Sequence, residues 1–346
     1  MRIVWIIVVI LVAFVVWRGL EFVDAAGFFR NLEPKSLVCV SVGGVTGPED
    51  VTIDRERSVA YLSGYDRRAA QAGKPMPGAI WTYDLSSADA VPVNVTPWAD
   101  KSFQPHGISL HVDAEGNRRL FVVSHGAGTH TIEILEERGG ILERIKTIKD
   151  KALRSPNDLA AIDATRFYVT NDHRYEEGHA LRTAEDFLGL PLTNVLYFDG
   201  GTFTEVASGL AGANGIHLSE DGATVYVSAA RGQTVQVYER DPDAGNLEKR
   251  KSIRVPGLPD NIEPGKDGGL LVALHPKPLQ LLEHFRNAKK RAPSQVIRLN
   301  PATGAITTLY LDRGEELSGA STAAIHDGNL LIGAITEPKF LDCALD

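Results

Sequence analysis

Pro105-His106-Gly107-Ile108-Ser109-Leu110, followed about ten residues later by Leu120-Phe121-Val122-Val123, is one copy of a pattern that recurs along the chain. Each copy has a polar turn motif, an alternating apolar segment and a second strand-like run. A repeat of about 46 to 58 residues made of short strands is typical of a β-propeller. We therefore predict an all-β, six-bladed β-propeller. The motifs are Pro48-Glu49-Asp50, Pro105-His106-Gly107, Pro156-Asn157-Asp158, Ala213-Asn214-Gly215, Pro259-Asp260-Asn261 and Leu317-Ser318-Gly319.

Length and charge agree with this architecture. The chain has 346 residues, and after an N-terminal segment the remainder suits six blades of about 50 residues. No linker of low complexity divides it, so we expect residues 31–346 to form one catalytic domain. The net charge of −8 argues against a nucleic-acid partner, whose binding surface would be basic, and is compatible with a cation site.

The N-terminus is apolar from Ile3 to Trp17, with Arg2 before this run and Arg18 after it. This is short for a membrane span and resembles the hydrophobic region of a signal peptide. We expect residues 1–30 to be an uncleaved signal anchor, helical and membrane-bound, and its linker. The alternative is cleavage near Val23-Asp24-Ala25. Both interpretations export the domain, either anchored on the periplasmic or extracellular side or secreted.

The two cysteines, Cys39 and Cys343, lie near the two ends of the predicted domain. A propeller closes by pairing the beginning of its chain with its end, so a disulfide here would join the ring. Such a bond requires an oxidising compartment, in agreement with export. Two free buried thiols are the alternative.

Two segments interrupt the strand pattern. Residues 183–192 and 278–291 have helical apolar spacing, and the second ends in Lys289-Lys290-Arg291. Each follows the second strand of a blade, so we expect both to crown the face on which the motifs begin. They either cap exposed strand ends or contact a membrane or substrate.

The motifs place oxygen-bearing side chains at equivalent points of successive blades. A single Asn or Asp in a turn is more often a turn former than a ligand, but recurrence at the blade interval favours a shared site. Hard oxygen donors suit Ca²⁺. One ion is predicted at two carboxylates and three amides, and a second at two neighbouring carboxylates and a backbone carbonyl. The first set is Glu49, Asn157, Asn214, Asp260 and Asn261, and the second is Asp50, Asp158 and the carbonyl of Ile108.

Two histidines accompany this set. His106 occupies the motif position of the second blade, and His125 ends the next strand on the same face. A histidine beside a metal suggests a general base, and a second histidine would orient it. A structural hydrogen bond in the channel is the alternative role for His106. The chain has no Gly-x-Ser-x-Gly motif, so a serine nucleophile is not supported.

Taken together, these motifs resemble the paraoxonase/arylesterase family over about residues 30–346. The resemblance rests on Gly47-Pro48-Glu49-Asp50, Pro105-His106-Gly107-Ile108-Ser109, Asn157-Asp158, Thr170-Asn171-Asp172-His173, Ala213-Asn214-Gly215-Ile216, Asp260-Asn261-Ile262 and Leu331-Ile332-Gly333. It implies two Ca²⁺ ions, one catalytic and one structural, at the two predicted ligand sets. It also implies a His106–His125 dyad, a ring-closing disulfide and a retained N-terminal helix. One departure is Leu274, which stands before His275-Pro276 where the family has a free cysteine.

The resemblance implies a hydrolase of lactones and aryl esters in which Ca²⁺ polarises the carbonyl and the dyad activates water. The apolar crown favours a hydrophobic small-molecule substrate. Two alternatives remain, a non-catalytic propeller that binds other proteins and a gluconolactonase-like sugar lactonase. The sequence makes no prediction about the oligomeric state.

Overall fold

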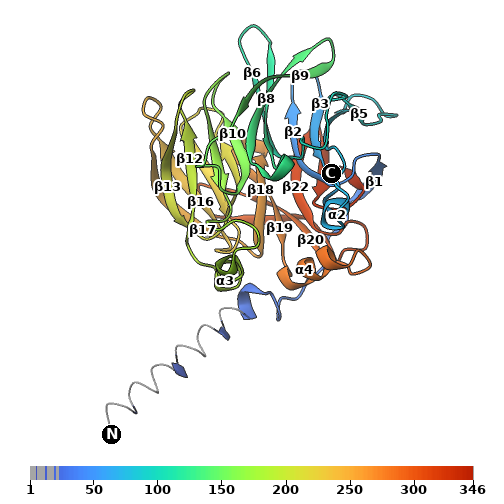
Figure 1. The fold of residues 1–346 in the computed structure, drawn as a ribbon. Helices are drawn as coiled ribbons and strands as arrows, with labels where there is room; N and C mark the ends of the chain where they lie inside the picture. The colour runs from blue at the N-terminus through green and yellow to red at the C-terminus, as the bar shows by residue number, and fades with distance from the viewer. Residues whose placement is uncertain (1–4, 6–11, 14–18, 21–22, 346) are drawn as a thin grey trace.

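In the computed structural model of the chain, which describes residues 5, 12, 13, 19, 20 and 23–345, the strands form six four-stranded antiparallel sheets. The sheets surround a central axis, and the innermost strand of each lies beside the innermost strands of its neighbours (Figure 1). The prediction of a six-bladed β-propeller is therefore confirmed.

The blades follow one another in chain order, each starting at the axis. The first three blades contain β2 (Pro48–Asp54), β3 (Val59–Gly64), β4 (Ala79–Asp84) and β5 (Val93–Asn94); β6 (Pro105–Val112), β7 (Arg118–Ser124), β8 (Thr131–Arg138) and β9 (Ile141–Ile148); and β10 (Pro156–Ala161), β11 (Phe167–Asn171), β12 (Thr193–Phe198) and β13 (Phe203–Leu210). The next two contain β14 (Ala213–Leu218), β15 (Thr224–Ala229), β16 (Thr234–Arg240) and β17 (Leu247–Arg254); and β18 (Leu258–Pro264), β19 (Leu270–His275), β20 (Ser294–Leu299) and β21 (Ile306–Asp312). Two 3-10 turns, η1 (Gly126–Gly128) and η2 (Lys266–Gly268), lie between strands.

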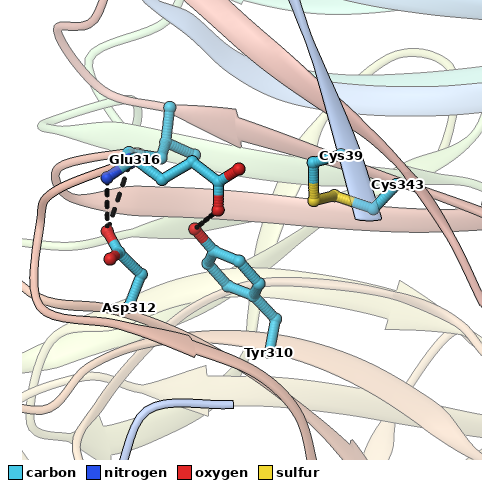
Figure 2. Close-up of a disulfide and its surroundings, with 6 residues drawn as sticks. Cys39, Tyr310, Asp312, Glu316 and Cys343 are labelled. Atoms are coloured by element: carbon cyan, nitrogen blue, oxygen red, sulfur yellow. Dashed lines mark hydrogen bonds between the residues drawn. A yellow bond between two sulfur atoms is a disulfide. The ribbon is translucent and has the colours of Figure 1, made fainter. Parts of the chain in front are cut away.

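The sixth blade closes the ring. It combines β22 (Ala320–His326), β23 (Asn329–Ala334) and β24 (Lys339–Ala344) with β1 (Val38–Gly43), the first strand of the chain, as its outermost strand. In the β1–β24 ladder Cys39 is paired directly with Cys343, and the two form a disulfide (Figure 2). Beside it, the Tyr310 hydroxyl donates a hydrogen bond to Glu316. The predicted ring-closing disulfide is confirmed, and it is consistent with export.

The core lies between blades, which explains why the second strands are apolar throughout. In β7, Leu120 and Val122 pack towards Tyr61 of the preceding blade. Phe121 and Val123 point to the opposite face and pack against Phe167 of the following blade. Successive side chains of a strand point to opposite faces, so a strand buried on both faces has no polar alternation.

Three helices lie on one face of the propeller (Figure 1). They are α2 (Arg67–Gln71), α3 (Ala180–Leu188) and α4 (Pro278–Arg286). Two were predicted, on the correct face but with different bounds. The helix expected at 183–192 begins earlier, because His179 caps it by accepting from the Leu181 N–H, and ends where Gly189 adopts a left-handed conformation. The helix expected at 278–291 ends at Arg286, so the basic residues 289–291 follow the helix.

The segment that precedes β1 runs along the same face. The side chains of Gln233, Lys277 and Arg30 donate hydrogen bonds to the carbonyls of Ala25, Gly27 and Pro276 respectively. Most of the predicted signal anchor, from Ile3 to Trp17, lies outside the described residues. Within the described part of the chain, no helix has the length and apolar character needed to span a membrane.

Candidate functional site

The polar motifs lie where the inner strands bulge. In all six blades the pairing register between the first and second strands shifts at or beside the motif. The shifts fall between Pro48 and Asp50, Pro105 and Ile108, Pro156 and Leu159, Ala213 and Ile216, Pro259 and Ile262, and Ala320 and Thr322. A bulge leaves its extra residues outside the ladder and re-aims their side chains, and bulges are common next to active sites.

The sixth motif is displaced from its predicted place. Leu317-Ser318-Gly319 precedes β22, and the residue inside the bulge is Ser321. Its buried hydroxyl donates to the backbone oxygen of Glu49 at 2.6 Å. The last blade is thereby joined to the first at the site.

The predicted ligands of the first ion lie on the bulges of β2, β10, β14 and β18. The Asn261 amide donates to both the backbone oxygen and Oε1 of Glu49, each at 3.1 Å. Asp260 Oδ2 accepts from His275 Nε2 at 2.8 Å. Asn157 and Asn214 occupy the equivalent positions of β10 and β14, without a hydrogen bond to Glu49.

Four of these five predicted ligands have a buried side-chain oxygen without a hydrogen-bond partner. Glu49 Oε2, Asn157 Oδ1, Asn214 Oδ1 and Asn261 Oδ1 are all buried and accept no hydrogen bond. Leaving such a group unpaired costs about 1–3 kcal/mol each, and more when it is charged. Four such atoms lie among the five residues predicted to hold the first ion.

A second row of residues follows the first by one position. Asp50 accepts hydrogen bonds from the Ile108 N–H at 2.8 Å and from the Thr322 hydroxyl at 3.2 Å. Asp158 accepts from the Ile216 N–H, also at 2.8 Å. Each aspartate therefore binds the backbone of a neighbouring inner strand. Ile108 contacts Asp50 through its amide N–H.

The histidines form a chain that is one member longer than predicted. His106 Nε2 lies 3.5 Å from Glu49 Oε1, and His106 Nδ1 lies 2.8 Å from His125 Nε2. His125 Nδ1 in turn lies 2.8 Å from Nδ1 of His130, which the sequence analysis missed. His130 stands immediately before β8. Its only signal in the sequence is a histidine five residues after another one at a strand end.

Comparisons with known proteins identify the family of this chain. A family model described as arylesterase matches residues 69–345. The chain is 33% identical to serum paraoxonase/lactonase 3 of Oryctolagus cuniculus over 346 residues, or 96% of each chain. It is 32% identical to serum paraoxonase/arylesterase 2 of Gallus gallus over 330 residues, or 92% of each chain.

The chain belongs to the paraoxonase/arylesterase family. Among solved structures, a gluconolactonase from Xanthomonas campestris superposes with a TM-score of 0.51 and 19% sequence identity, covering 92% of this chain and 99% of the other. That likeness shows the shared propeller fold alone.

The acidic residues of this paraoxonase-family site are crowded and buried. Burial, together with repulsion from Glu49, raises the pKa of Asp50 to about 7. Burial and the charge of Asp50 raise the pKa of Asp158 well above its ordinary value. Burial also raises the pKa of Asp260 despite its bond to His275. Buried acids that resist ionisation on their own are those that a bound cation would stabilise as carboxylates.

Glu49 differs from these aspartates. Burial opposes its ionisation, but His106 and then Arg67 and Asn261 together lower its pKa. Glu49 is therefore ionised at the centre of the site. Burial lowers the pKa of His125 well below its ordinary value, and the neighbouring His106 and His130 add to this effect, so His125 is neutral near pH 7.

Arg67 is a second residue that the sequence analysis missed. It begins α2, directly after β3, and its Nη2 lies 3.9 Å from Glu49 Oε2. Its Nη1 donates a long hydrogen bond of 3.5 Å to the Ile335 carbonyl. The sequence offered one signal for Arg67: it is a charged residue shortly after the end of a second strand, and the second strands end on the face of the site.

The segment Thr170 to His173 anchors α3. His173 Nδ1 bonds Asp172 at 2.7 Å, and His173 Nε2 bonds Asp186 of α3 at 2.8 Å. Arg231 reaches both His173 and Asp186 at 3.1 Å. Asp172 Oδ2 also accepts from the Asn157 amide at 3.5 Å, so the anchor of α3 is connected to a predicted ligand.

Proposed function

We propose that this protein is a calcium-dependent hydrolase of lactones and aryl esters. The observation that carries the proposal is the set of buried, unpaired oxygens on Glu49, Asn157, Asn214 and Asn261 beside a histidine chain. Membership of the paraoxonase/arylesterase family supports it, since relatives carry the names arylesterase and lactonase.

The donor set fits calcium. Glu49 and Asp260 bring two negative charges, and three amide oxygens complete a set of hard ligands. Asp50 and Asp158, with the Ile108 carbonyl, would hold a structural second ion. No three His, Cys, Asp or Glu side chains gather into a metal site among the described residues, so an amide-rich calcium site fits better than a zinc site.

Bound calcium supplies a Lewis acid that polarises the ester carbonyl and stabilises negative charge on its oxygen. His106 is then the residue that removes a proton from water, through its Nε2 lone pair. For this, His106 Nδ1 must carry a proton and donate it to His125 Nε2, 2.8 Å away. His125 thus orients the base.

The first experiment measures hydrolysis of phenyl acetate and of γ- and δ-lactones, with calcium and with excess chelator. We expect calcium-dependent turnover that favours lactones. If no ester is hydrolysed while calcium still raises the melting temperature, the protein is a binding scaffold and not a hydrolase.

The base assignment is tested with His106→Gln. General-base catalysis contributes on the order of 10²–10⁴ in rate, so we expect a loss of that size in kcat. A near wild-type rate would move the role to Glu49 or Asp260. Asp260→Ala should abolish activity and the binding of the first calcium ion, measured by calorimetry. Activity that persists without this ion would contradict the proposal.

We also propose that the helix-bearing face contacts a membrane surface and that the substrate is hydrophobic. Phe28 and Phe29 of the N-terminal segment are 58% and 90% exposed, and α3 exposes Leu181. Exposed large apolar side chains that gather on one face are typical of interaction surfaces. Co-sedimentation with phospholipid vesicles should fall in Phe28→Ser/Phe29→Ser; unchanged sedimentation would contradict this surface.

A further inference from the structure

The three histidines His106, His125 and His130 make two consecutive nitrogen–nitrogen hydrogen bonds, each of 2.8 Å. Both ring pairs are edge-on, with centroids 5.0 Å apart. Only the first of these bonds belongs to the dyad on which the proposed function rests. The second joins His125 to His130, which has no part in that mechanism.

The turn that carries the second bond is fixed in place. The His125 N–H donates to the Gln104 carbonyl at 3.1 Å, and the next residue, Gly126, packs against Ser102. A Cβ added to Gly126 would lie 1.5 Å from the Ser102 carbonyl oxygen, so no other residue fits there without a backbone shift. The backbone that carries the His125 ring is therefore tightly packed at this turn.

The proton count restricts this chain to two arrangements. Each nitrogen–nitrogen bond between neutral rings holds one proton, with one nitrogen donating and the other accepting. In the first arrangement His106 Nδ1 donates to His125 Nε2, and His125 Nδ1 donates to His130 Nδ1. In the second arrangement both bonds are reversed, and the last proton lies on His106 Nε2 and points at Glu49 Oε1, 3.5 Å away.

Only the first arrangement leaves a lone pair on His106 Nε2 for catalysis. Glu49 Oε1 lies 3.5 Å from His106 Nε2 and can accept a proton from it, which favours the second. A hydrogen-bond acceptor for the Nδ1 proton of His125 favours the first arrangement instead, and His130 Nδ1, 2.8 Å away, is placed to be that acceptor. The carboxylates of Asp172 and Glu176 and the guanidinium of Arg182 also act on His130 electrostatically.

We propose that His130 is a positioning residue that holds His125, and through it His106, in the tautomer in which His106 Nε2 is free to accept a proton. His130 does this by accepting the hydrogen bond from His125 Nδ1. The inference rests on the proposed hydrolytic function and extends it to a residue that touches neither substrate nor metal ligand.

The test compares His130→Asn with His130→Leu. Asn and Leu branch at the same carbon, but only Asn has an oxygen that accepts close to where His Nδ1 lies. His111→Leu is the matched control, because His111 lies at the other end of β6 from His106. All four proteins are labelled with ¹⁵N-histidine, and the tautomer of His125 is read from its ring nitrogen shifts.

We expect His125 to carry its proton on Nδ1 in the wild type, in His130→Asn and in His111→Leu, and on Nε2 in His130→Leu. The kcat of His130→Leu should fall on the order of 10- to 100-fold with KM nearly unchanged, which is less than the loss on removing the base itself. His130→Asn should recover most of the rate.

Three results would overturn the proposal: a wild-type His125 protonated on Nε2, an unchanged His125 tautomer in His130→Leu, or equal losses of kcat in the Asn and Leu variants. The tautomer measurement does not depend on turnover. A wild type that hydrolyses no ester but shows the expected tautomers would therefore count against the hydrolytic function and leave the positioning role of His130 supported.

Discussion

Reduction of the Cys39–Cys343 bond should destabilise the protein more than most single changes. The bond joins residues 304 positions apart, through strands that close the ring. In the chain-entropy description, closing a loop of this size reduces the conformational entropy of the unfolded chain. This raises the free energy of the unfolded chain by about 5–6 kcal/mol. The β1–β24 ladder keeps its backbone hydrogen bonds when the sulfurs are reduced, so the effect should come from the unfolded state.

The assay is guanidinium unfolding followed by tryptophan fluorescence, at a fixed calcium concentration, with and without a reductant. Reduction keeps both sulfur atoms in the core and so separates the crosslink from packing. Cys39→Ser/Cys343→Ser is the control, which should unfold at the same denaturant concentration under both conditions.

We expect the free energy of unfolding to fall by several kcal/mol on reduction of the wild type only. A fall of less than about 1 kcal/mol, with complete reduction shown by thiol titration, would refute the reasoning. It would mean that the pairing of β1 with β24 persists in the unfolded ensemble and already restricts the chain.

Two other predictions concern the site. The raised pKa of Asp50, about 7, means that the calcium-free fold binds more protons than the unfolded chain between about pH 4 and 7, so its stability falls as pH rises through this range. Calcium binds the ionised carboxylate, so the increase in melting temperature on adding calcium should grow from pH 5 to pH 8. The apparent affinity for calcium should fall about tenfold per pH unit below 7 for each displaced proton. A melting-temperature increase that is independent of pH would contradict this. Gly215→Ala would bring a Cβ to 2.4 Å from the Asp260 carbonyl oxygen and 2.6 Å from the Asn261 Cα, so it should cost about 1–3 kcal/mol and weaken calcium binding. Gly201→Ala, whose Cβ has its nearest neighbour at 3.5 Å, should change stability by less than about 0.5 kcal/mol, and equal effects of the two changes would contradict the packing argument.

The repeat in the sequence predicts the blade number, the inner strands and the face of the site, because a strand buried on both sides and a polar bulge leave a strong local pattern. It also placed Glu49 and Asp260 at equivalent positions of the first and fifth blades. Asn261, the residue after Asp260, donates a hydrogen bond to Glu49 across the ring. The sixth motif was misplaced because Ser318 and Ser321 are equally compatible with a turn. Local sequence could not separate the two.

What the sequence by itself determined is therefore which residue types stand at the blade interval: acids, amides, a histidine and the closing cysteines. The tertiary structure alone decided which of them touch. His130 lies 2.8 Å from His125 across a turn in which Gly126 packs on Ser102, a residue of the preceding inter-blade loop. Arg67, at the start of the short helix α2 after β3, lies 3.9 Å from Glu49 of β2. Such contacts depend on how blades pack side by side, and nothing within one repeat encodes the distance between two of them.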